Sequence, residues 1–70
     1  MNKKIIGKNA SIVWQTLHNN TLSWEELLKQ TKLSPVELAY AIGWLAREDK
    51  ITFYQRNGIA FFGIFHETYY

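Results

Sequence analysis

The 70-residue sequence contains no cysteine, only one proline and no long hydrophobic run. Without cysteine the chain can form neither a disulfide framework nor a cysteine-based zinc site, and it is compatible with a reducing compartment. No stretch approaches the roughly 18 apolar residues that cross a bilayer. The apolar segment after Lys3 and Lys4 stops at Gly7, which is too short for a signal peptide. We therefore expect a cytoplasmic protein without a membrane partner.

A strong charge of one sign is also missing. The formal net charge is +2 and the isoelectric point is about 9.0. A dedicated nucleic-acid-binding protein usually carries a clustered basic face. Here the Lys and Arg residues are dispersed along the chain, so ordinary solubilising charge explains them as well as phosphate binding does.

The motifs of common enzymes are absent as well. His18 and His66 are the only histidines, and neither has a catalytic partner nearby in the sequence. The chain contains no Gly-rich phosphate loop and no nucleophile elbow. Glu25 and Glu26 stand at a predicted helix start, where carboxylates stabilise the helix dipole. Two distant histidines and scattered carboxylates do not make a metal-ligand set. The sequence predicts a protein that is not an enzyme and has no cofactor, metal site or evident small-molecule ligand.

Almost half of the residues, 47%, are hydrophobic, and three of them are Trp. This composition is too apolar for a disordered segment. A chain of this length forms at most one domain, with a core near the lower limit for independent folding. We expect a single domain over residues 1–70, with its core at about residues 8–65.

The first predicted helix spans residues 9–18, with Asn9 as its N-cap and Asn19-Asn20 at its end. Apolar residues recur there at the i, i+3, i+4, i+7 spacing of one buried helix face. That face contains Ala10, Val13, Trp14 and Leu17.

Two capping boxes then predict two further helices. Ser23 precedes Glu26 by three residues, and Ser34 precedes Glu37 by three, with Pro35 at the first helical position. The second helix is expected over Trp24–Thr31 and the third over Pro35–Glu48, with a short extended segment at Thr21-Leu22 before them. The residues expected to be buried are Leu27 and Leu28 in the second helix, and Leu38, Ile42 and Leu45, flanked by Ala41 and Ala46, in the third.

The hydrophobic period changes from helical to alternating at Ile51. Residues 51–56 and 59–65 are predicted strands, joined by Asn57-Gly58, a pair typical of a type I′ hairpin turn. A two-residue turn places Arg56 opposite Ile59 and so sets the register. The face expected to pack on the helices contains Ile51, Phe53, Phe62 and Ile64. The outer face contains Thr52, Tyr54, Arg56, Ile59, Phe61, Gly63 and Phe65. Such an aromatic outer face indicates an interface, unless Tyr69-Tyr70 or Ile5-Ile6 folds over it.

Three helices followed by a hairpin form an α+β fold, the winged helix-turn-helix. The segment from Leu33-Ser34-Pro35 through Leu38, Ile42 and Leu45 to Lys50-Ile51 resembles the recognition-helix block of winged-helix transcription regulators. Residues 43–51 (GWLAREDKI) resemble the signature of a small, largely uncharacterised winged helix-turn-helix family of bacteria and archaea, within the winged-helix DNA-binding superfamily. The resemblance covers residues 8–65. It implies a DNA-binding module in transcription regulation and no established ligand.

Two hypotheses about the partner remain open. In the first, DNA is bound by residues that face the groove or hold phosphates: Lys32, Ser34, Tyr40, Arg47, Lys50 and Arg56. In the second, another protein or a second copy of the chain contacts an aromatic surface: Val36, Tyr40, Trp44, Tyr54, Ile59 and Phe61. The residues from Ser34 to Glu48 carry a net charge of −1, from Glu37, Arg47 and Glu48, which favours the second hypothesis, whereas the family resemblance favours the first. Trp44 can act as an interface anchor or pack inside the domain, and Gly43 suggests a close neighbour at the third helix.

Overall fold

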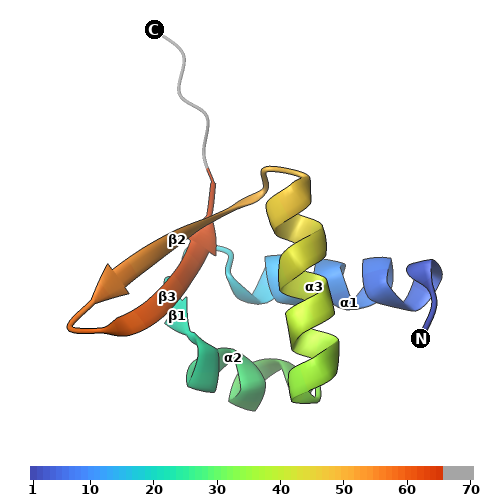
Figure 1. Cartoon of the computed structure of the whole chain (residues 1–70), viewed down its shortest axis with the longest axis horizontal. Helices are drawn as coiled ribbons and strands as arrows, with labels where there is room; N and C mark the ends of the chain where they lie inside the picture. Colours follow the sequence, from blue (N-terminus) through green and yellow to red (C-terminus); the bar gives the residue numbers. More distant parts are fainter. Residues whose placement is uncertain (66–70) are drawn as a thin grey trace, which may run out of the picture.

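The computed structural model describes residues 1–65. Three helices and a three-stranded antiparallel sheet make up this part of the chain and confirm the predicted α+β winged-helix architecture. α3 crosses in front of α1, α2 lies beside the lower end of α3, and the β2–β3 hairpin projects to one side (Figure 1). The elements are α1 (Lys3–Thr16), β1 (Leu22–Ser23), α2 (Trp24–Thr31), α3 (Pro35–Arg47), β2 (Ile51–Arg56) and β3 (Ile59–Ile64). None of the helices in residues 1–65 is long and apolar enough to cross a membrane.

One hydrophobic cluster joins all of these elements. Its most deeply buried side chains are those of Val13, Leu17, Leu27 and Leu38, contributed by α1, its C-terminal cap, α2 and α3. Half-buried side chains, including those of Leu28, Trp44 and Ile64, pack around the cluster. The full set of buried hydrophobic residues is Ala10, Val13, Leu17, Leu22, Leu27, Leu38, Ala41, Ile42, Leu45, Ile51 and Phe62.

Both predicted capping boxes are present. The Ser34 hydroxyl accepts from the Glu37 N–H at 3.2 Å, and the Glu37 carboxylate accepts from the Ser34 N–H at 2.9 Å. Ser23 and Glu26 make the same two bonds. Because the chain supplies its own acceptors, both helix starts fall where the sequence predicted. α2 ends as predicted, and α3 ends one residue early, at Arg47.

The prediction for the first helix was wrong at both ends. α1 begins at Lys3, because the Asn2 side chain accepts from the Ile5 N–H at 2.9 Å and caps the helix two turns before Asn9. Asn9 is instead buried within α1. The helix ends at Thr16, and Asn19 follows it in the left-handed region with φ 62°. Trp14, expected in the buried stripe, is an exposed residue.

The sheet has the strand order β1-β3-β2 and the predicted hairpin register, with Arg56 opposite Ile59 and Tyr54 opposite Phe61. Asn57 and Gly58 both have positive φ, 52° and 78°, as a type I′ turn requires. β1 covers Leu22–Ser23, one residue later than expected, and β3 ends at Ile64, one residue before the predicted end.

Only part of the expected inner face of the hairpin is covered. Ile51 and Phe62 are buried and Ile64 is half-buried, but Phe53 is 55% exposed. Phe53 lies on the predicted face, and its ring packs edge-on against Phe62 at 5.5 Å between centroids. The expected packing of Phe53 on the helices was wrong, because the hairpin projects beyond them (Figure 1).

Two segments, Ile5-Ile6 and Tyr69-Tyr70, were expected as alternatives that could fold over the outer face of the hairpin. Ile5 and Ile6 lie in the first turns of α1, at the end of the molecule far from the hairpin (Figure 1), so they do not cover it. Tyr69-Tyr70 lies outside the described residues. Tyr54, Ile59 and Phe65 are exposed on this face in the described part of the chain.

Candidate functional site

The side of α3 turned away from the core is uncovered along its whole length in residues 1–65. Leu38, Ala41 and Leu45 bury one side of the helix. The opposite side presents Val36 and Tyr40, which are 59% and 53% exposed, followed by Gly43 and Arg47. A helix of 13 residues with a free side of this length is a surface that a groove or another protein can accept.

Gly43 lies at the centre of that free side. A Cβ atom built on Gly43 meets nothing within 4 Å, so no neighbour in the described chain requires glycine there. Of the neighbours that glycine suggested here, one from within residues 1–65 is therefore absent, and close approach by a partner stays a prediction. The missing side chain leaves the backbone of α3 accessible at this position.

Trp44 turns toward α1. It is half-buried against the core, and its Cζ2 atom lies 3.8 Å from where a Cβ on Gly7 would stand. A shallow hollow between α1 and α3 also contains Trp14 and Lys50 in its walls. Of the two roles considered for Trp44, packing inside the domain accounts for these contacts.

The predicted phosphate-binding side chains lie around α3 and on the hairpin. Lys32 closes α2 in the left-handed conformation, with φ 60°, just before α3 begins. Arg47 is in the last turn of α3, Lys50 lies between α3 and β2, and Arg56 is the last residue before the hairpin turn. All four are exposed. Ser34 is exposed too, but its hydroxyl oxygen already accepts the capping hydrogen bond from Glu37.

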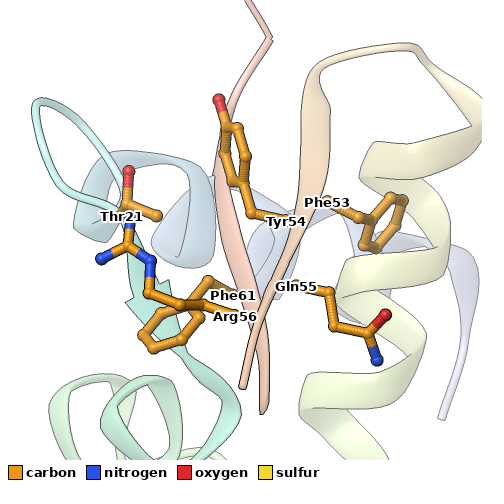
Figure 2. A pocket seen from close by; sticks show the side chains of 6 residues that line it. All are labelled: Thr21, Phe53, Tyr54, Gln55, Arg56 and Phe61. Carbon is orange, nitrogen blue, oxygen red and sulfur yellow. The ribbon is translucent and has the colours of Figure 1, made fainter. Parts of the chain in front are cut away.

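The hairpin carries a hollow that is lined by Thr21, Phe53, Tyr54, Gln55, Arg56 and Phe61. Figure 2 shows Tyr54, Arg56 and Phe61 on the side of the hairpin near Thr21, whereas Phe53 and Gln55 extend to the other side, toward α3. The Arg56 guanidinium lies over the Phe61 ring at 6.0 Å from its centroid. The Tyr54 ring lies across Gly63, 3.1 Å from where a Cβ would stand.

Sequence reasoning did not identify Thr21 as part of this hollow. Gly63, which the sequence placed on the outer face with Tyr54, pairs with Thr52 and is therefore the diagonal neighbour of Tyr54 across the strands. Thr21 enters only because β1 pairs with β3, a contact between segments far apart in the sequence.

The structure separates the residues of the second hypothesis. Val36 and Tyr40 lie on the free side of α3, and Trp44 faces α1. The remaining three, Tyr54, Ile59 and Phe61, share the outer face of the hairpin. A protein-binding surface across all six stays a prediction. Within residues 1–65, no group of three or more His, Asp or Glu side chains could hold a metal ion.

Comparison with known proteins finds several similar structures. Protein BT2368 from Bacteroides thetaiotaomicron, solved in solution, is 40% identical, with a TM-score of 0.82 over 91% of this chain and 79% of that one. The transcriptional regulator HlyU from Vibrio vulnificus is 27% identical, with a TM-score of 0.73 over 86% of this chain and 62% of that one. HlyU from Vibrio cholerae is 23% identical, with a TM-score of 0.64 over 91% of this chain and 80% of that one, and shares the fold.

No curated protein matches the chain. The model of one protein family, described as a winged helix-turn-helix domain (DUF2582), matches residues 1–63. That match includes all three helices, the hairpin turn and nearly all of β3. The chain belongs to the DUF2582 family of winged helix-turn-helix domains.

Proposed function

We propose that this domain acts by binding rather than catalysis, and that it binds duplex DNA in transcription regulation through the free side of α3 and the hairpin. The observation that carries the proposal is the uncovered side of α3 standing beside a projecting hairpin (Figure 1). In winged-helix regulators the corresponding helix enters the major groove and the wing contacts the flanking backbone.

The charges support phosphate contacts at the margins of this surface. Lys32 precedes α3, Arg47 is its last residue, Lys50 follows it, and Arg56 is at the hairpin tip. Positive side chains at these places can hold phosphates on both sides of a groove.

The middle of α3 supports a different kind of contact. Val36 and Tyr40 offer apolar surface to thymine methyl groups, and Gly43 lets the helix backbone approach the bases closely. Because this stretch has no Lys, Asn or Gln for bidentate reading of a base, we expect weak sequence preference from α3 itself.

The similar proteins support the regulatory part of the proposal. The Vibrio vulnificus HlyU is a transcriptional regulator, and this chain spans 62% of its length. That likeness and the free surface of α3 together support a regulatory role for this chain.

The test is a titration of labelled random-sequence duplex DNA with the protein at several salt concentrations, with fluorescence anisotropy of the DNA as the readout. Four phosphate contacts, from Lys32, Arg47, Lys50 and Arg56, predict a slope of about −3.6 in log K against log salt. Arg56→Ala should reduce the slope to about −2.7. Lys4→Ala, on the first turn of α1, serves as the matched control and should leave the slope unchanged.

Two results would contradict the proposal. The first is no anisotropy change at low salt with ~0.1 mM protein, since even non-specific binders associate at that concentration. The second is an equal loss of binding in Lys4→Ala and Arg56→Ala, which would indicate general charge attraction rather than a surface formed by α3 and the hairpin.

A further inference from the structure

The sheet carries positive charge and no negative charge. Residues 50–65, which contain β2 and β3, have two charged side chains, Lys50 and Arg56, and no carboxylate. Residues 1–23, which contain β1, have no Asp or Glu either. At the start of α2 the Glu26 carboxylate is engaged, because it accepts from the Ser23 N–H at 2.9 Å. The hollow on the hairpin is therefore complementary in charge to an anion.

The same hollow has apolar aromatic walls. Its volume is about 680 Å³, which is within the range of small-molecule sites. The Tyr54 ring packs against Gly63 and still remains 50% exposed, so it is held in place with much of its surface open. The Phe61 ring is half-buried beside it on the same face. The hydroxyl groups of Thr21 and Tyr54 add hydrogen-bond donors (Figure 2).

Arg56 is placed to hold an anion at this hollow. Its guanidinium lies over the Phe61 ring, 6.0 Å from the centroid. A guanidinium stacked on a ring keeps the N–H donors along its edge available for the oxygens of a phosphate. Because stacking already orders the side chain, less rotamer freedom is lost when the anion binds.

These features fit a ligand that is flat, has apolar faces and carries a negative charge beside them. A nucleotide has this form, with a base that stacks and a phosphate that is an anion. Proteins that bind single-stranded nucleic acid combine the same two elements, aromatic side chains under the bases and positive charge along the backbone. A base inside a duplex cannot use such a hollow, because its faces are covered by the neighbouring base pairs until it leaves the stack.

We propose that the hollow binds an unpaired nucleotide of single-stranded DNA, with its base on the Tyr54 and Phe61 rings and its phosphate on Arg56. This site goes beyond the duplex surface proposed above, because it lies on the side of the hairpin near Thr21 and not on the side toward α3 (Figure 2). Arg56 is the one residue that the two surfaces share. The choice of DNA over RNA rests on the proposed function.

A matched pair of variants on β2 tests the stacking. Leucine at position 54 keeps an apolar contact with Gly63 but removes the ring. Tyr54→Leu should weaken binding of a labelled oligothymidine of about ten nucleotides by at least about fivefold in fluorescence anisotropy, and Phe61→Leu should act in the same direction. Phe53→Leu is the control, because Phe53 is 55% exposed but extends toward α3, and it should leave the affinity unchanged. Equal effects of Tyr54→Leu and Phe53→Leu would overturn the proposal, as would no binding at ~0.1 mM protein.

NMR shift mapping locates the two kinds of DNA on the protein. Oligothymidine should shift the amide signals of Thr21 and Phe61 and leave those of Val36 and Tyr40 in place. Shifts at Val36 and Tyr40 alone would overturn the proposal. Duplex binding should be unchanged by Tyr54→Leu, which also shows that this variant is folded. If oligothymidine binds and duplex does not, only the proposed function fails; if duplex binds and oligothymidine does not, only the present proposal fails.

Two further ligands distinguish the sources of a nucleotide. Thymidine monophosphate should bind at least about tenfold more weakly than oligothymidine, because a strand offers several bases and phosphates to the same surface. Oligouridine should bind no more tightly than oligothymidine. Equal affinity for the monophosphate would overturn a strand site in favour of a free nucleotide, and tighter binding of oligouridine would overturn the assignment to DNA.

Discussion

Replacing Gly43 by Ala should stabilise the domain. Gly43 lies in the interior of α3, on its exposed side, and its φ is not positive. Alanine therefore fits the backbone without strain, and the new Cβ meets nothing within 4 Å. Alanine is favoured over glycine in a helix interior by about 0.8–1.0 kcal/mol, because glycine loses more backbone entropy on folding. The free energy of unfolding should rise by about this amount.

Thermal denaturation followed by circular dichroism measures the effect. A domain of this size gains about 4–8 °C in Tm for each kcal/mol of stability. Gly63→Ala is the matched control, because its Cβ would stand 3.1 Å from the Tyr54 ring and 3.4 Å from the Thr21 hydroxyl. It should bring no increase in Tm. An unchanged or lower Tm for Gly43→Ala would refute the reasoning, since it would mean that the side of α3 at Gly43 is not open in solution.

The same variant bears on the proposed DNA contact. If the backbone of α3 approaches the bases at Gly43, the added methyl group should weaken DNA binding while it stabilises the free protein. Opposite changes in Tm and affinity would separate a binding effect from a folding effect. Stronger or unchanged DNA binding would contradict a close approach at Gly43.

Three further predictions concern stability and can be checked by urea denaturation. Leu38→Ala removes a fully buried side chain and should reduce the free energy of unfolding by about 2–5 kcal/mol; a smaller loss would mean that the core collapses around the site. Ser34→Ala removes the acceptor for the Glu37 N–H and should cost about 1 kcal/mol, whereas Ser11→Ala, on the exposed side of α1, should cost much less. Asn57→Ala places alanine at φ 52° and should cost about 1 kcal/mol, and Asn57→Gly should be tolerated; equal losses for the two variants would argue against a strained turn.

Local chemistry determines most of the fold, without any tertiary contact. The starts of α2 and α3 follow from Ser23 and Ser34, because each serine bonds to an amide only three residues away. The hairpin register follows from Asn57-Gly58, because a two-residue turn leaves only one pairing of the flanking strands. The buried side of α3 follows from the helical spacing of Leu38, Ile42 and Leu45.

The candidate site was only partly predictable, because local signals act over a few residues and part of the site depends on a contact between distant segments. Lys32, Arg47 and Arg56 are exposed, as charged residues at the ends of elements usually are. The hollow beneath Tyr54 required the pairing of β1 with β3, which brings Thr21 near the hairpin across a long stretch of chain. No local pattern encodes such a contact.

Tertiary structure decided how far each predicted surface is covered. The alternation of the strands assigned Phe53 to the inner face correctly, but the helices end before the hairpin does, so the ring is exposed. Asn2 and Asn9 are both suitable helix caps; the structure has Asn2 as the cap and Asn9 buried inside α1. The direction of Trp44 depends on α1, because the Trp44 ring lies beside Gly7 of that helix. The sequence by itself determined the elements, caps, turn and register, because those signals act over a few residues. The tertiary structure decided which faces remain open to a partner, because that depends on where one element ends relative to another.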